Sequence, residues 1–168
     1  MKAKLIINDK ELEVEISEKE LKKIENKFKK TGYERVDDNQ VFWYDAGGET
    51  GSDYDIHGDG EIKQMYEVAN YYSDFNVAYN NGRADKLMRR LRRFAVENRD
   101  WELDWNDFGQ WKYLICYDYA TGEPKIYEDN DVRQFGGVYF SSEEAGTLAI
   151  DTFRDELIWY FTEYKDSL

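Results

Sequence analysis

The 168-residue sequence has very few of the side chains that build metal centres and covalent cross-links, with one Cys, one His and one Pro. A lone Cys116 excludes an internal disulfide, and one Cys with one His excludes the usual zinc ligand sets. In a catalytic site where histidine activates a Ser or Cys nucleophile, His57 is the one histidine that could serve as the base. We therefore expect no cofactor, no metal and no catalytic residues, and hence a protein that is not an enzyme.

Long apolar runs are also missing. No stretch approaches the roughly 18 residues that cross a bilayer, and the first residues alternate charge and hydrophobe, unlike a signal peptide. These features predict a cytoplasmic protein without a membrane partner. Hydrophobic residues still make up 41% of the chain and aromatic residues 17%, which is enough for a core and excludes intrinsic disorder.

Positive charge is scarce, with 23 Lys and Arg against 36 Asp and Glu and a net charge of −13. The charge is uneven: residues 33–82 carry −9 and residues 100–168 carry −11, whereas residues 83–99 carry +5. An anionic surface of this size repels a phosphate backbone and favours basic partners. We expect no bulk nucleic-acid binding, while the basic segment either touches a phosphate or pairs with acids elsewhere in the protein.

Local patterns predict strands and helices in alternation. Hairpins are expected from residues 2–7 with 11–16 and from 33–36 with 41–45, and further strands at 112–117, 125–127, 137–140 and within 62–72. Helices are expected after the capping box of Ser17 and Glu20, at residues 74–98 with a kink or break at 80–82, and after a second capping box of Ser141 and Glu144. No fixed-period repeat is visible.

This order predicts an α+β fold of antiparallel strands with about three helices, as a small mixed domain or two small packed subdomains. Residues 1–45 would form a hairpin-helix-hairpin subdomain and residues 62–168 an α+β subdomain. An acidic, Gly-rich loop at residues 46–61 would lie between them.

Residues 53–61 offer the strongest ion-site pattern, because carboxylates two residues apart in a Gly-rich loop resemble the start of a calcium loop. The pattern then fails, since His57 and Gln64 stand where carboxylates are required. A solvated acidic turn is the simpler interpretation. The alternative is a divalent-metal-dependent enzyme that uses this loop, or Asp104, Asp107 and Asp118 converging from separate elements.

Several segments together resemble a family of small acidic proteins carried by phages and prophages of Gram-positive bacteria. They are residues 30–36 leading into 41–44, followed in order by 70–72, 92–98, 103–107, 112–118 and 138–145. The resemblance covers most of the chain, carries no catalytic motif, and departs from the family pattern at residues 80–82. It implies a phage context, in which small acidic proteins often inhibit host defence, as anti-CRISPR and anti-restriction proteins do.

The function hypothesis is a phage-encoded inhibitor of the anti-CRISPR type, which blocks a basic nucleic-acid-binding surface by charge mimicry of DNA. Its partner would be a basic protein or nucleoprotein of a host defence system, such as a Cas effector, in the bacterial cytoplasm. The expected partner-binding residues are Asp45, Glu49, Asp53, Asp55, Asp59, Glu61, Asp100, Glu102, Asp104 and Asp107. A further alternative is a module that assembles with itself or with other phage proteins through its aromatic surface and the helix at Arg83 to Arg99.

Overall fold

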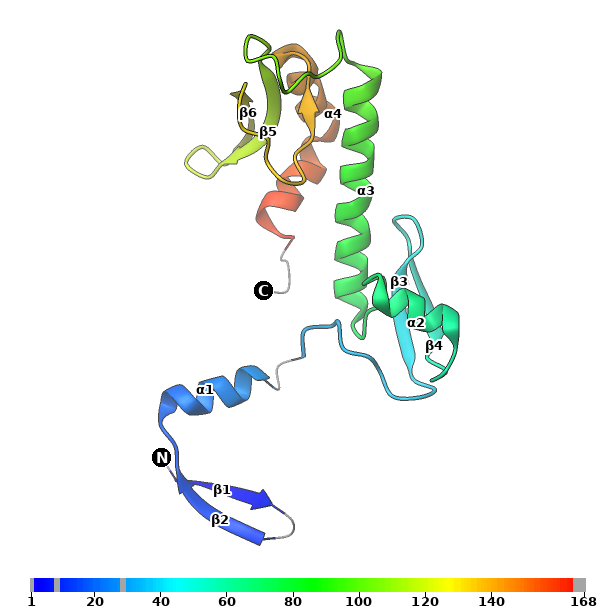
Figure 1. Ribbon diagram of the computed structural model, residues 1–168, viewed down its shortest axis with the longest axis vertical. Coiled ribbons are helices and arrows are strands. Elements are labelled where there is room, and N and C mark those ends of the chain that lie inside the picture. The colour runs from blue at the N-terminus through cyan, green and yellow to red at the C-terminus, as the bar shows by residue number, and fades with distance from the viewer. Residues whose placement is uncertain (1, 8–9, 28–29, 165–168) are drawn as a thin grey trace.

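The computed structural model describes residues 2–7, 10–27 and 30–164 (Figure 1) and has the expected α+β class. Within these residues, the four helices are α1 (Glu18–Lys27), α2 (Gly60–Glu67), α3 (Phe75–Glu97) and α4 (Glu143–Thr162). The strands are β1 (Lys2–Ile7), β2 (Lys10–Glu15), β3 (Val41–Asp45), β4 (Thr50–Tyr54), β5 (Lys112–Asp118), β6 (Glu123–Asp129) and β7 (Tyr139–Phe140). They pair antiparallel in three sheets, ordered β1-β2, β3-β4 and β6-β5-β7.

The N-terminal segment follows the prediction closely. Strands β1 and β2 form the expected hairpin, and α1 begins at the predicted capping box. Glu20 accepts hydrogen bonds from the Ser17 backbone N–H at 2.9 Å, while the Glu20 N–H donates to Ser17 Oγ at 3.3 Å. This hairpin and α1 project away from the other elements (Figure 1).

The prediction of a second hairpin, between residues 33–36 and 41–45, was wrong. Residues 33–36 form no strand, and β3 instead pairs with β4, across the boundary expected at residues 45–46. Gly47 and Gly48 adopt positive φ values of 84° and 100°, which glycine tolerates, so the chain turns tightly there. Part of the segment expected as a loop is therefore a strand.

Three predictions about helices also need correction. Residues 62–67 of the segment expected to contain a strand lie in α2, which Asp59 caps by accepting hydrogen bonds from the N–H groups of Glu61 and Ile62. Helix α3 runs unbroken through residues 80–82. The cap of α4 is Ser142 rather than Ser141, since Ser141 Oγ accepts a hydrogen bond from the Asp100 N–H.

The structure contains a repeated topological unit that the sequence pattern did not show. In each unit a later segment pairs with the free edge of the hairpin's first strand, through an isolated bridge in the first unit and through a short strand in the second, and a capped helix follows. Tyr72 bridges β3 at Trp43 before α3, just as β7 pairs with β5 before α4. Residues 71–74 (YYSD) and 139–142 (YFSS), 68 positions apart, thus occupy equivalent places.

Two hydrophobic clusters stabilise these units, and α3 joins them. The smaller cluster comprises Phe42, Ile62 and Tyr71. The larger one contains Leu87, Leu91 and Ala95 of α3, Phe140 of β7, and Ala145, Ala149, Ile150, Phe153 and Leu157 of α4. The first half of α3 lies against the β3-β4 hairpin, where Asp45 approaches Gly82. Among the described residues, no helix is long and apolar enough to cross a membrane.

Candidate functional site

The six carboxylates expected to bind a partner at residues 45–61 do not form one free surface. Asp45 lies 3.5 Å from the Arg89 guanidinium and accepts a hydrogen bond from the Gly48 N–H. Glu49 Oε1 lies 3.3 Å from Lys86 Nζ, and Asp59 caps α2. Asp45 and Asp59 therefore already stabilise the fold, whereas Glu49, whose side chain is 84% exposed, makes only a surface ion pair.

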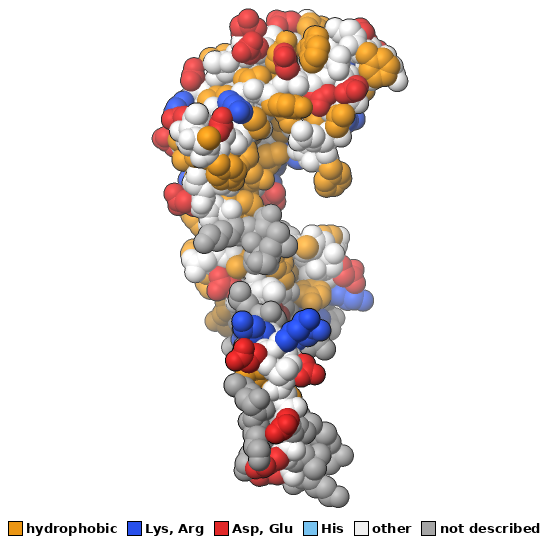
Figure 2. All heavy atoms as spheres, turned by 90° about the vertical axis from the view of Figure 1, so that its left-hand side faces the viewer, with side chains coloured by type: hydrophobic (Ala, Val, Ile, Leu, Met, Phe, Trp, Pro, Cys, Tyr) orange, Lys and Arg blue, Asp and Glu red, His pale blue; other side chains and the backbone are white. Residues whose placement is uncertain are grey.

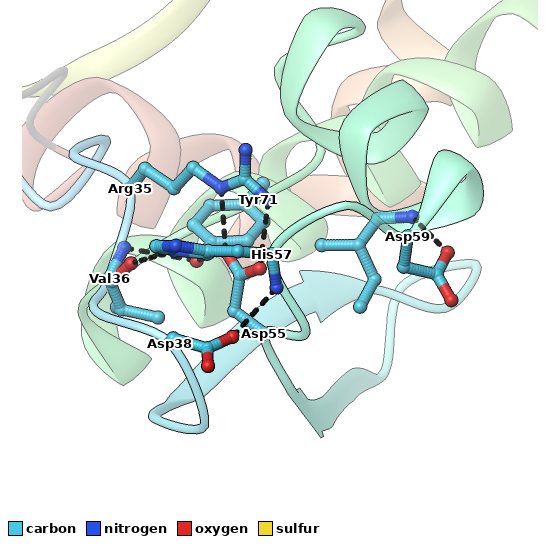
Figure 3. A network of polar contacts seen from close by, with 8 residues as sticks. Arg35, Val36, Asp38, Asp55, His57, Asp59 and Tyr71 are labelled. Atoms are coloured by element: carbon cyan, nitrogen blue, oxygen red, sulfur yellow. Dashed lines mark hydrogen bonds and ion pairs between the residues drawn. The ribbon is translucent and has the colours of Figure 1, made fainter.

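Asp55 is fully buried, so the prediction that it meets a partner was wrong (Figure 3). Its two oxygens accept hydrogen bonds from Arg35, from Nε at 2.8 Å and from Nη2 at 2.9 Å. The Tyr71 hydroxyl donates a third bond at 2.7 Å and accepts one from the Val36 N–H at 3.0 Å. A buried carboxylate requires such compensation, and this network ties residues 35–36 to the end of β4.

The network determines the protonation of its members. The hydrogen bonds from the Arg35 guanidinium lower the pKa of Asp55, and the Tyr71 hydroxyl adds to this effect. Burial, together with the bond to the Asp55 carboxylate, raises the pKa of Tyr71 to about 12. Both groups therefore keep one charge state near neutral pH, which makes the network a structural device.

The single histidine also has a structural place. The His57 N–H donates to Asp38 Oδ1 at 2.8 Å, and its ring Nε2 lies 3.1 Å from the Val36 carbonyl oxygen (Figure 3). Both contacts hold the segment before β3 against the segment after β4.

Glu34 fixes the chain before β3. It accepts hydrogen bonds from the Thr31 N–H at 2.6 Å, the Gly32 N–H at 3.0 Å and Ser73 Oγ at 3.2 Å. The bond from the Thr31 backbone is the largest of the effects that lower the pKa of Glu34 to about 2. The segment is thereby joined to the residues that start α3.

Low pH should remove the stabilisation that the Glu34 carboxylate gives to the folded state. The folded pKa of Glu34 lies below its ordinary value of 4.5, so the carboxylate stabilises the folded state above about pH 4.5, and the effect disappears as the pH falls towards 2. We expect the free energy of unfolding of Glu34→Gln to fall less than that of the wild type between about pH 4.5 and pH 2. Urea unfolding at several pH values measures this difference. Glu61→Gln, at an exposed carboxylate, is the control, and identical profiles for the two variants would contradict the prediction.

The second set of predicted carboxylates lies on the segment between α3 and β5. Asp100, Glu102, Asp104 and Asp107 are all exposed. Glu102 pairs with Arg99 at 2.6 Å and remains 78% exposed. Asp104 and Asp107 use one oxygen each for local N–H groups, those of Asn106 and Gly109.

Side chains fix the backbone of this acidic segment from several directions. The Asp104 N–H donates to Gln110 Oε1 at 2.6 Å, and the Gln110 amide returns a bond to the Glu102 carbonyl at 3.2 Å. The buried Lys112 donates to the Asp107 carbonyl at 2.9 Å, and Asn130 donates to that of Phe108 at 2.8 Å. The exposed carboxylates are therefore presented on an ordered backbone.

The alternative of a divalent-metal site has no assembled ligand set. Across the part of the chain that the structure describes, no three His, Cys, Asp or Glu side chains are grouped so that they could hold a metal ion. Asp118 instead accepts a hydrogen bond from Lys125 Nζ at 2.9 Å. Residues 53–61 are split between β4, a turn and α2.

The basic segment of α3 largely pairs with the protein's own acids. Arg83 meets Glu156, Arg93 meets Glu97, and the pairs of Lys86 and Arg89 are those described above. Sequence reasoning anticipated such pairing. It missed Arg35 and Tyr71 as partners of Asp55, for which the sequence carries no local signal.

Comparison with protein-family models, curated proteins and solved structures finds no match to this chain.

Proposed function

We propose that the protein is a stoichiometric binding protein whose ordered acidic segment, residues 100–107, occupies a basic surface of a nucleic-acid-handling protein. The observation that carries the proposal is the combination of four exposed carboxylates with a backbone fixed by Gln110, Lys112, Asn130 and Ser141. Binding by such a segment costs little ordering entropy.

Charge supports the same conclusion. Residues 100–168 carry −11, whereas the cations of α3 are largely neutralised within the protein. Figure 2 shows acidic side chains at many points of the face formed by the second repeated unit, and basic side chains at few. Carboxylates spread over a firm surface can compete with phosphates for the same Lys and Arg residues.

The resemblance to small phage proteins extends the proposal to a partner class. In the cytoplasm of a Gram-positive host, the partner would be an effector of a defence system, such as a Cas nuclease, and the outcome would be inhibition. We place the main binding surface at residues 100–107 because Asp45 pairs with Arg89, Asp55 is buried and Asp59 caps α2. Glu49 is exposed but forms an ion pair with Lys86. Asp53 and Glu61 remain exposed and would contribute at a separate place.

The test is a capture experiment with matched charge variants. Tagged protein is incubated with lysate of a Gram-positive host at about 50 mM and about 200 mM salt, and retained proteins are identified by mass spectrometry. We expect capture of a nucleic-acid-binding protein that is lost at high salt and displaced by added DNA. The variant D100N/E102Q/D104N/D107N should lose this capture while keeping its local hydrogen bonds.

The control variant E128Q/D151N/D155N/E163Q removes the same charge from other exposed positions and should retain the partner. Equal loss in both variants would show that only net charge matters. Retention by the first variant, or capture that DNA does not displace, would rule out mimicry by this segment.

The alternative of a self-assembling module stays a prediction. Phe135 is fully exposed beside an apolar groove lined by Leu87, Leu91, Phe140 and Leu157. It is the surface that such a module would use.

A further inference from the structure

A basic pocket lies where α3, α4 and the turn between β3 and β4 meet. Its cavity has a volume of about 230 Å³. Arg83, Lys86 and Arg90 line it from one face of α3, and Glu49, Tyr79 and Glu156 complete it. The spacing of three and four residues between the cations places them on adjacent helical turns.

The two guanidinium groups are held on aromatic rings of α4. The Arg83 guanidinium lies 3.8 Å from the centre of the Trp159 ring, and the Arg90 guanidinium lies 4.8 Å from that of Phe153. Arg83 is also bound by both oxygens of Glu156, at 2.9 and 3.2 Å. For Arg90, the described residues supply no carboxylate partner, so its donors remain available to a bound anion.

The carboxylate that pairs with Lys86 can be replaced by another anion. Glu49 reaches it at 3.3 Å from the hairpin turn, and the Glu49 side chain is 84% exposed. The turn lies close to the lysine, because a Cβ added to Gly48 would come within 2.6 Å of Lys86 Cδ. Glu49 thus stands where a stronger anion could replace it, since an exposed ion pair of this kind is weak.

Three cations against two carboxylates leave the pocket locally positive. Screening over about 8 Å at physiological ionic strength lets this local charge outweigh the distant acids for a small ligand. A long polyanion would also meet the net charge of −13, which opposes its binding. The cavity is smaller than the roughly 300 Å³ at which pockets for drug-sized ligands begin, so it fits phosphate groups rather than a whole nucleotide.

We propose that this pocket binds the oligophosphate group of a small nucleotide, with Arg90 and Lys86 as its main contacts and Arg83 as a fixed neighbour. The nucleoside would lie outside the cavity, where a strip of aromatic side chains leads away from it. Tyr79, 49% exposed, stacks on Phe75 at 6.1 Å, and Phe75 meets Trp43 edge-on at 5.2 Å. Such aromatic side chains can stack on the base of a nucleotide whose phosphates are bound by the neighbouring cations.

The experiment is calorimetric titration of the full chain with ATP at about 0.15 M salt. We expect saturable binding that pyrophosphate competes away and that adenosine alone does not. Arg90→Gln should weaken ATP binding at least about tenfold, because it removes a charged donor without leaving a carboxylate unpaired. Glu49→Gln should tighten binding about threefold, since it removes the competing anion.

Arg92→Gln is the matched control, because Arg92 is an exposed cation of the same helix outside the pocket, and it should bind ATP like the wild type. Circular dichroism of each variant verifies the fold. Absence of ATP and pyrophosphate binding at millimolar concentration, or equal effects of Arg90→Gln and Arg92→Gln, would overturn the proposal. Tighter binding of a short single-stranded oligonucleotide than of ATP would also overturn it, in favour of a polymer. None of these outcomes depends on the acidic segment at residues 100–107.

Discussion

Replacing Asp55 with alanine is expected to lower the free energy of unfolding by about 3 kcal/mol. The substitution leaves the Arg35 guanidinium and the Tyr71 hydroxyl without their acceptor, and loss of one member of a buried ion pair costs about 3–5 kcal/mol. We expect the lower end of this range because the Arg35 side chain is 32% exposed and can regain water. Urea unfolding followed by fluorescence of the Trp residues measures the difference.

Asp53→Asn is the control for Asp55→Ala. Asp53 lies two residues earlier, on β4, and is exposed, so its replacement should change the unfolding free energy by no more than about 0.5 kcal/mol. Equal effects of the two substitutions would mean that the network with Arg35 and Tyr71 contributes nothing beyond surface charge.

Replacing Phe140 with alanine is expected to cost about 3–5 kcal/mol, the usual range for a buried phenylalanine. Phe140 is 1% exposed and belongs to the cluster shared by α3, β7 and α4. Its loss would leave a cavity between the two long helices. The unfolding midpoint in urea should therefore fall, and the pocket at Arg90 should lose ATP affinity as the helices separate.

Phe135 offers a control of the same chemistry. It stands five residues earlier and is fully exposed, so Phe135→Ala should leave the midpoint nearly unchanged. If Phe135→Ala destabilises the protein as much as Phe140→Ala, the ring of Phe135 is covered in solution, and the prediction that only Phe140 of the two contributes to the core fails.

Features with a local cause could be predicted from the sequence. The hairpin of β1 and β2 follows from alternation around a turn, and the start of α1 follows from Ser17 and Glu20. Strand β3 was placed correctly but with the wrong partner, because residues 46–61 were interpreted as an acidic loop and residues 33–36 as the paired strand. Gly47 and Gly48 adopt positive φ values, which allow the tight turn that brings β4 back onto β3.

The remaining features depend on contacts between distant residues. Asp55 belongs to a pattern that resembles an ion loop, and only the approach of Arg35 and Tyr71, 20 and 16 residues away, makes it a buried structural group. The guanidinium of Arg90 is placed by Phe153, which lies on another helix. The carboxylates at residues 100–107 are exposed and their role in partner binding stays a prediction; the side chains that order them come from Gln110, Lys112, Asn130 and Ser141, which sequence patterns do not connect to them.

Helix α3 has a mechanical consequence. Its 23 residues extend for about 34 Å at a rise of about 1.5 Å per residue, and it contacts the hairpin of the first unit and the core of the second. It therefore acts as a rigid spacer between Asp53 and Glu61 at one end and the acidic segment at the other. That length is close to one turn of double-helical DNA, about 34–36 Å. A partner that engages both ends must therefore span at least about the length of this helix.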